Sequence, residues 1–209
     1  LEYRGYDSAG IGVVHNNELQ VIKKSGKIAE LQDSVPPDLE GSYGIGHTRW
    51  ATHGEVTDLN AHPHTDDSGR LAVVHNGIIE NFESLKEKLT SQGHVFKTQT
   101  DSEVIAHLVS EYYDGDLEQA VRQAVALIKG TYGILCVHAD EPDILVGARN
   151  GSPLVLGIGI DEMFLASDVT AMIAYTKQVV YVEDGEIVTI WPDGYRTTAI
   201  ELDSHAGTH

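Results

Sequence analysis

The sequence is poor in cysteine and in positive charge. Its 209 residues include one cysteine, and 32 acidic side chains against 14 lysines and arginines give a formal net charge of −18. A single thiol, Cys136, excludes an internal disulfide framework and suits a reducing cytoplasm, which is the location we expect. The negative charge repels phosphate backbones and anionic lipid, so we expect neither nucleic acid nor a membrane as a partner.

Long hydrophobic runs are also missing. No apolar stretch approaches the roughly 20 residues that a membrane-spanning helix needs. The hydrophobic fraction of 41% is nevertheless typical of a globular chain. A chain of this length is long enough for one sizeable domain with its own core.

The eleven histidines of the sequence could suggest a metal site. They are scattered along the chain, Pro63 separates His62 from His64, and no CxxC spacing accompanies them. We therefore predict no metal site and no cofactor.

Hydrophobic periodicity predicts strands on both sides of a helical block. Apolar runs at 11–15 and 18–24 flank Asn16-Asn17 and predict a hairpin, and Asp184-Gly185 predicts another between 179–182 and 186–191. Helical spacing and glycine stops predict three helices, at 81–92, 101–113 and 117–129. The expected fold class is α+β, with two antiparallel sheets and the helices packed outside.

The segment His47-Thr-Arg-Trp-Ala-Thr-His-Gly54 follows a predicted buried strand at 43–47. The planar guanidinium of Arg49 suits a carboxylate, and Thr52 and His53 add hydrogen-bond donors nearby. The competing interpretation is a structural salt bridge at Arg49 and a core position for Trp50.

A second segment, His75-Asn-Gly-Ile-Ile-Glu80, follows the apolar strand at 71–74. Asn76-Gly77 locally favours a turn. The functional alternative is an oxyanion hole, in which the Asn76 amide and the Gly77 backbone N–H donate to one developing negative oxygen.

The third segment is Thr98-Gln-Thr-Asp-Ser-Glu103. Locally, Asp101 is an acid in a first helical turn, and Thr100 with Glu103 matches a capping box. Asp101 is also suited to an ammonium group. An arginine for a carboxylate and an aspartate for an ammonium make an amino-acid site, but sequence spacing leaves open whether Arg49 and Asp101 converge.

Five motifs occur in order along nearly the whole chain. They are Arg4-Gly-Tyr-Asp-Ser-Ala-Gly10, His47-Thr-Arg-Trp-Ala-Thr-His-Gly54, Asn60-Ala-His-Pro-His64, His75-Asn-Gly-Ile-Ile-Glu-Asn81 and Thr100-Asp-Ser-Glu103. Together they resemble the class II glutamine amidotransferase domain of the glucosamine-6-phosphate synthase family. Amidophosphoribosyltransferase and asparagine synthetase share this type of domain with different residues at these points.

This resemblance implies a four-layer αββα sandwich of the N-terminal-nucleophile hydrolase type. Residues 1–202 would be the glutaminase domain, and 203–209 a polar tail or the start of a linker to a sugar-isomerase domain. The family splits L-glutamine into glutamate and ammonia, which the isomerase domain uses to convert fructose 6-phosphate to glucosamine 6-phosphate. The full enzyme is expected to be a homodimer.

The resemblance also assigns roles around the substrate. Arg49 would bind the glutamine α-carboxylate, with Thr52 and His53 beside it. Asp101 would bind the α-ammonium, helped by the Gly77 carbonyl.

Further roles follow for the reacting end of the substrate. Asn76 and the Gly77 N–H would form the oxyanion hole, and Arg4 would lie beside the nucleophile. Trp50 resembles the tryptophan associated with ammonia passage between domains. His62 and His64 are expected to shape a mobile loop, and neither is expected to act as a base.

The family nucleophile is an N-terminal cysteine whose own α-amino group is the base. This sequence begins at Leu1, in what matches the end of the family's first helix, so we expect the first strand, most of that helix and the nucleophile to be absent and the fragment to be inactive. Cys136 lies in an apolar strand and is not expected to replace the nucleophile. The alternatives are a non-catalytic glutamine-binding module, the glutaminase domain of another amidotransferase such as amidophosphoribosyltransferase, and a histidine-rich metal-binding protein.

Overall fold

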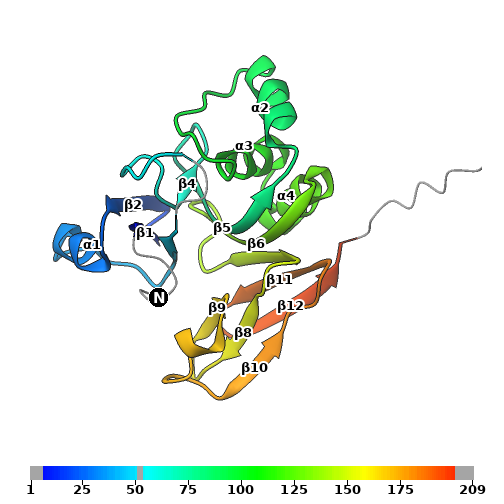
Figure 1. Cartoon of the computed structure of the whole chain (residues 1–209). Coiled ribbons are helices and arrows are strands. Elements are labelled where there is room, and N and C mark those ends of the chain that lie inside the picture. Colours follow the sequence, from blue (N-terminus) through cyan, green and yellow to red (C-terminus); the bar gives the residue numbers. More distant parts are fainter. Residues whose placement is uncertain (1–6, 51–53, 201–209) are drawn as a thin grey trace, which may run out of the picture.

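The computed structural model describes residues 7–50 and 54–200. Its strands form one large sheet and two small ones, and every named strand pair is antiparallel (Figure 1). The large sheet has the order β12-β11-β7-β6-β5-β4. Its strands are β4 (His64–Thr65), β5 (Leu71–Ile79), β6 (Gly130–His138), β7 (Leu145–Asn150), β11 (Glu186–Trp191) and β12 (Gly194–Ala199).

Each small sheet has three strands. One has the order β2-β1-β3 and the other the order β10-β8-β9. Their strands are β1 (Ser8–His15), β2 (Glu18–Ser25), β3 (Tyr43–Arg49), β8 (Val155–Ile158), β9 (Met163–Ala166) and β10 (Gln178–Tyr181). A 3₁₀ turn, η1 (Val169–Ala171), lies between β9 and β10.

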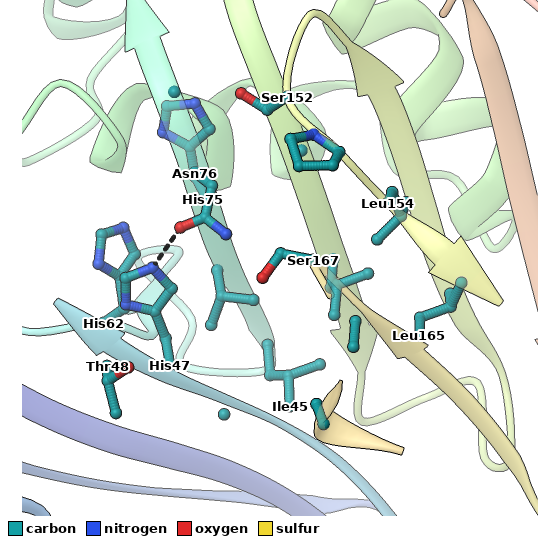
Figure 2. Close-up of a pocket in the computed structure, with 18 of the residues that line it drawn as sticks. Ile45, His47, Thr48, His62, His75, Asn76, Ser152, Leu154, Leu165 and Ser167 are labelled. Carbon is teal, nitrogen blue, oxygen red and sulfur yellow. Dashed lines mark hydrogen bonds between the residues drawn. The ribbon is translucent and has the colours of Figure 1, made fainter. Parts of the chain in front are cut away.

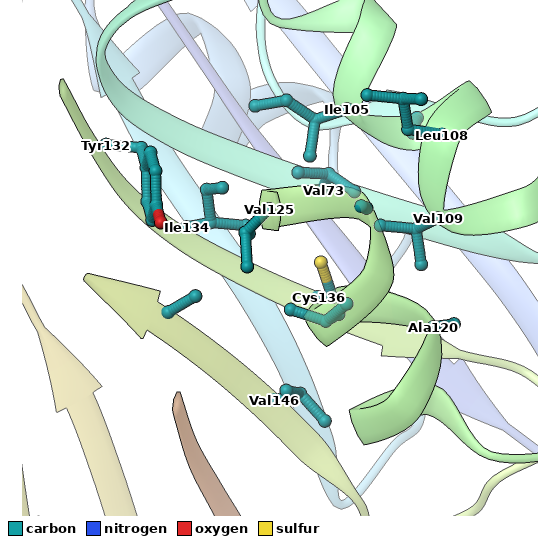
Figure 3. Close-up of a cluster of buried hydrophobic side chains, with 14 of the residues drawn as sticks. Val73, Ile105, Leu108, Val109, Ala120, Val125, Tyr132, Ile134, Cys136 and Val146 are labelled. Atoms are coloured by element: carbon teal, nitrogen blue, oxygen red, sulfur yellow. The ribbon is translucent and has the colours of Figure 1, made fainter. Parts of the chain in front are cut away.

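The helices cover one face of the large sheet. Helices α2 (Phe82–Ser91), α3 (Glu103–Tyr112) and α4 (Leu117–Leu127) pack there in a core that includes Val73 and Cys136 of the sheet (Figure 3). A second core, which includes Val74 and Val137, packs the opposite face against the two small sheets. Helix α1 (Ile28–Ser34) packs against β1 and β2.

These layers confirm the sandwich fold class that the sequence predicts. The first hairpin is also confirmed, since Asn16 and Asn17 connect β1 to β2 with φ values of 50° and 61°. Asparagine tolerates this left-handed conformation better than most residues. Among the described residues, no helix combines the length and the apolar character needed to cross a lipid bilayer.

Two expectations about the sheets are wrong. The described strands form three sheets rather than two, because the β8–β10 sheet is separate from the β1–β3 sheet. Strands β10 and β11 do not form a hairpin: β10 pairs with β8, whereas β11 pairs with β7 and β12. The backbone at 182–185 instead bonds elsewhere, with Val182 N donating to Leu154 O just before β8 (3.1 Å) and Gly185 N to Arg149 O of β7 (2.8 Å).

The close approach of β1 to the 60–65 segment predicts a stability difference between two glycines of one strand. A Cβ at Gly10 would lie 2.1 Å from the His62 carbonyl oxygen, whereas the nearest atom to a Cβ at Gly12 is 3.5 Å away. Gly10→Ala should therefore lower the free energy of unfolding by about 2 kcal/mol or more, and Gly12→Ala by less than about 1 kcal/mol. Urea denaturation of both variants measures this, and equal midpoints would show that the contact is not a constraint.

Candidate functional site

One cavity of about 670 Å³ lies between the large sheet and the small sheets. Its lining comes from β3, β5, β6, β7, β9 and β11 and from the residues just before α3 and just before β8. Five predicted site residues line it, although they come from three distant segments: Arg49, Trp50, Asn76, Gly77 and Asp101. The predicted residues Arg4, Thr52 and His53 lie outside the described part of the chain.

Asn76 and Gly77 lie within strand β5 and do not form a turn. Asn76 pairs with Gly133 of β6, and Gly77 pairs with Tyr132. Gly77 has φ of 136°, and a Cβ there would lie 2.0 Å from the Thr131 carbonyl oxygen. The turn expected from Asn-Gly is therefore wrong, because glycine here allows two strand backbones to approach closely.

The side-chain amide of Asn76 has a defined orientation. His47 Nε2 lies 2.9 Å from Asn76 Oδ1. Burial lowers the pKa of His47 to about 4, so its ring is neutral near pH 7 and donates this bond from Nε2. Figure 2 shows the amide nitrogen of Asn76 on the side away from His47. The two N–H donors of Asn76 are therefore directed away from His47.

Arg49 is a buried cation in the cavity wall, with only 5% of its surface exposed. Its Nη1 donates to the Glu55 carbonyl oxygen at 3.2 Å. Burial lowers the pKa of the guanidinium, and the negative charges of Asp7 and Asp101 act in the opposite direction. The negative charges of Asp7 and Asp101 thus both favour the charged form of Arg49, and Asp101 lines the same cavity.

Asp101 is the matching buried anion, with 7% of its surface exposed. Its Oδ2 accepts the Ile79 backbone N–H at 2.8 Å, and Ser102 Oγ donates to Oδ1 at 3.3 Å. These bonds join the end of β5 to the residues before α3. They also orient the carboxylate without neutralising its charge.

The capping box expected from Thr100 and Glu103 is not formed. Helix α3 begins at Glu103, and its N-cap residue Ser102 makes no side-chain capping bond. The Glu103 carboxylate instead accepts the backbone N–H groups of Lys97 and Thr98, each at 2.8 Å. The Glu103 carboxylate therefore binds the backbone of the preceding loop and does not take part in a capping box.

Four histidines cluster beside the cavity, of which His62, His64 and His75 are buried and His47 is half-buried. The His62 ring centroid is 4.2 Å from that of His47 and 4.5 Å from that of His64. His75 Nδ1 bonds to Ser102 Oγ at 2.8 Å and so ties β5 to the start of α3. Burial lowers the pKa values of all four, that of His64 to about 3. Near pH 7 these rings are therefore neutral, and they fill space with polar groups that carry no charge.

His62 and His64 lie in a buried segment, and the mobility expected of their loop stays a prediction. Sequence reasoning missed His47 and His75. Each occupies the first position of a motif that was already selected for Arg49 or Asn76. Their position within those motifs was the available signal.

Trp50 and Cys136 differ sharply in exposure. Trp50 lines the cavity yet is 60% exposed, so the competing interpretation of a core tryptophan is wrong, and its role in ammonia passage stays a prediction. Cys136 is fully buried on the helix side of β6 (Figure 3), whereas its neighbours Gly133 and Leu135 line the cavity on the other side. Burial raises the pKa of the Cys136 thiol. Its thiol thus faces the helices, as predicted for a small hydrophobe.

The sandwich and its cavity correspond to a known structural class. The glutamine phosphoribosylpyrophosphate amidotransferase of B. subtilis superposes with a TM-score of 0.82 and 28% identity, over 97% of this chain and 45% of that one. The fold is therefore that of the N-terminal-nucleophile amidotransferases. A family model described as a glutamine amidotransferase domain matches residues 47–174, more than half of the chain. The chain belongs to this glutamine amidotransferase family.

Curated relatives carry a more specific name. Glutamine–fructose-6-phosphate aminotransferases (isomerizing) from Thermus thermophilus and Aquifex aeolicus are 51% and 52% identical over 202 and 194 residues. These alignments cover 96% and 92% of this chain but 33% of each relative. The chain therefore spans about a third of the length of these relatives.

The buried neutral histidines predict acid sensitivity. The unfolded chain binds protons at histidine near pH 6.5, whereas folded His47 and His64 bind them only near pH 4 and 3. Because the unfolded state binds more protons in this window, stability should rise with pH. Each of these histidines should lower the free energy of unfolding by about 1–2 kcal/mol when the pH falls from 7 to 5.

Urea denaturation at several pH values measures this slope. His64→Gln should reduce the pH dependence of the free energy of unfolding by the contribution of one histidine. His15→Gln, which leaves the buried cluster intact, is the control. Burial acts to lower the pKa of His94, but its bonds to Glu111 and Asp67 raise it, so His94 offsets part of the effect. A stability that is flat from pH 7 to pH 5 would contradict the neutral-cluster interpretation.

Proposed function

We propose that the cavity binds L-glutamine and that the chain is part of the glutaminase domain of an amidotransferase, which hydrolyses the glutamine amide. The observation that carries this proposal is the pairing of buried Arg49 with buried Asp101 on one cavity. A free amino acid presents a carboxylate and an ammonium on one carbon. A guanidinium and a carboxylate in the same wall are complementary to that pair.

The neighbouring donors match the chemistry of amide hydrolysis. Attack on the glutamine amide makes the carbonyl oxygen negative, and donors that are already in place stabilise that charge. The Asn76 amide and the Gly77 N–H line the same cavity and are the proposed oxyanion hole. The His47 bond to Asn76 Oδ1 supports the role because it leaves the amide nitrogen to donate.

The nucleophile in this proposal is not Cys136. That thiol lies on the opposite face of β6 from the cavity, and burial raises its pKa, which disfavours the reactive thiolate. The family resemblance implies a cysteine at the first position of the mature chain, and no residue of the printed sequence matches it. We therefore expect these 209 residues alone to be inactive toward glutamine.

The names of the relatives support fructose 6-phosphate as the acceptor of the ammonia. Identity of 51% to an aminotransferase of that name, against 28% to the phosphoribosylpyrophosphate enzyme, favours this acceptor over the alternative. In this proposal residues 1–202 are the glutaminase domain, a sugar-isomerase domain follows, and the full enzyme is a cytoplasmic homodimer. Exposed Trp50 lies beside the ammonia path. Arg4, Thr52 and His53 keep the roles that the resemblance implies.

The amino-acid site predicts losses of glutamine affinity from two conservative changes. Arg49→Lys removes the planar fork, and Asp101→Asn removes the charge while leaving an oxygen to accept the Ile79 N–H. Each should cost about 1–3 kcal/mol, a Kd roughly 5- to 150-fold higher. Calorimetric titration with glutamine measures the Kd. It uses a longer chain that begins with the family cysteine, with that cysteine chemically blocked.

Matched controls exist for both changes. Arg149→Lys alters an arginine that does not line the cavity. Asp66→Asn alters a buried aspartate that also accepts a backbone N–H, from Leu71 at 3.1 Å. Unchanged affinity in Arg49→Lys or Asp101→Asn, or equal losses in the controls, would show that the site lies elsewhere.

The oxyanion role predicts a change in rate without a matching change in binding. Asn76→Ala, in a longer chain that begins with the family cysteine, should lower kcat roughly 100-fold or more and leave KM almost unchanged. The bond strengthens only as negative charge develops, so the ground state loses little. Steady-state glutamate release measures both constants, with Cys136→Ser as a control of unchanged kcat. A raised KM with normal kcat would make Asn76 a ground-state contact instead.

A further inference from the structure

A cluster of metal-binding side chains lies apart from the cavity. Asp67 follows β4, His94 lies in the loop after α2, and His107 lies on α3. One carboxylate oxygen and one nitrogen from each ring lie within 4.8 Å of one another. None of the three residues lines the proposed glutamine cavity. Because the three are far apart in sequence, no spacing motif revealed them.

The donor atoms converge on one point. Asp67 Oδ2 lies 2.8 Å from His94 Nδ1 and 3.4 Å from His107 Nδ1. The other oxygen, Oδ1, accepts the Val95 backbone N–H at 3.3 Å and so turns Oδ2 toward the rings. A tetrahedral zinc ion with bonds of about 2.0–2.1 Å separates its ligands by roughly 3.3–3.4 Å. The His107 pair already has this separation, and the His94 pair needs to open by about half an ångström to match the same edge length.

Both rings are supported in the way metal-binding histidines usually are. His94 Nε2 lies 3.1 Å from Glu111 Oε2, and His107 Nε2 lies 3.7 Å from Glu103 Oε1. Each ring therefore presents Nδ1 to the shared centre and Nε2 to a carboxylate. A carboxylate behind a ligating histidine fixes the tautomer and raises the basicity of the metal-binding nitrogen.

His107 is difficult to explain without a ligand. Its surface is 1% exposed, and neither ring nitrogen makes a hydrogen bond within the described residues. Its ring packs against Phe96 and His94, at centroid distances of 4.6 and 5.0 Å. Carboxylate oxygens lie 3.4 Å from Nδ1 (Asp67) and 3.7 Å from Nε2 (Glu103), but neither contact is a hydrogen bond, and a buried polar ring without a hydrogen bond is costly. A metal ion bound to Nδ1 would supply the missing partner.

We propose that Asp67 Oδ2, His94 Nδ1 and His107 Nδ1 bind a divalent transition metal, zinc by preference, with water as the fourth ligand. Two imidazoles and one carboxylate suit zinc better than calcium or magnesium, which prefer oxygen alone. Asp67, at 38% side-chain exposure, leaves the site open to solvent. This inference departs from the expectation of no metal.

A bound ion would stabilise the loop before α3, which carries Asp101 to the glutamine cavity. Glu103, which lies behind His107, also accepts the backbone N–H groups of Lys97 and Thr98. The ion would therefore join α3 to the loop that carries Asp101. Its role is structural, and it does not depend on the proposed glutaminase activity.

Metal titration of the 209-residue chain tests the proposal. The protein is prepared without an affinity tag, stripped with a chelator, and carries His205→Gln and His209→Gln so that the C-terminal histidines contribute no ligands. Calorimetry with Zn²⁺ should give one ion per chain, and Co²⁺ should produce the visible bands of a tetrahedral site. Zinc should raise the melting temperature by several degrees.

Two of the ligands, exposed Asp67 and partly buried His94, can be changed without emptying the core. Asp67→Asn and His94→Gln should each lower Zn²⁺ affinity at least about 10-fold and remove the melting shift. His15→Gln is the matched control, because this ring also lies beside a carboxylate, Glu40 at 3.4 Å, but belongs to β1. If the parent chain binds no ion, or if Asp67→Asn and His94→Gln bind like the control, the proposal is wrong. The cluster would then be a protonated His94 paired with two carboxylates.

Discussion

The backbone contact between Gly77 and Thr131 is the constraint on which the rest of the site depends. A side chain at position 77 would overlap the Thr131 carbonyl, so only glycine lets β5 continue beside β6 at this point. Because the strand continues, Asn76 stays on the cavity face and the Ile79 N–H reaches Asp101. One achiral residue therefore fixes both the proposed oxyanion donors and the proposed ammonium acceptor. The proposed oxyanion donors are part of the sheet, and Asp101, in the loop before α3, is tied to that sheet through the Ile79 N–H.

Local sequence patterns were sufficient where neighbouring residues decide the structure. The Asn16-Asn17 hairpin and the helices at 82–91, 103–112 and 117–127 follow from turn chemistry and apolar periodicity. The predictions failed where pairing with strands distant in the sequence determines the backbone conformation. Asn76-Gly77 has turn chemistry, but pairing with β6 keeps it extended. Asp184-Gly185 likewise connects two strands that find their partners in different sheets.

The candidate site was predictable only in part from the residues themselves. The chemistry of Arg49 and Asp101 indicates an amino-acid site, but no local pattern says that the two lie on one cavity. The ordered motifs supplied that expectation, and in the structure both residues line the same cavity. Local sequence patterns also failed to reveal the proposed metal cluster. Its ligands come from three segments whose proximity depends on how α3 packs on the sheet, so no spacing rule detects it.

Strand β5 is the shared wall of two cores, with Val73 packed among the helices and Val74 among the small sheets. Alternation with period two means that inserting or deleting one residue in this strand would exchange the two faces. Helix-side and cavity-side residues would change places together, and Asn76 would turn away from the cavity. Point substitutions can be absorbed by one core at a time, whereas length changes in β5 damage both. Natural variation in chain length among relatives should therefore be confined to the connections, such as the segment between β3 and β4, while the length of β5 stays constant.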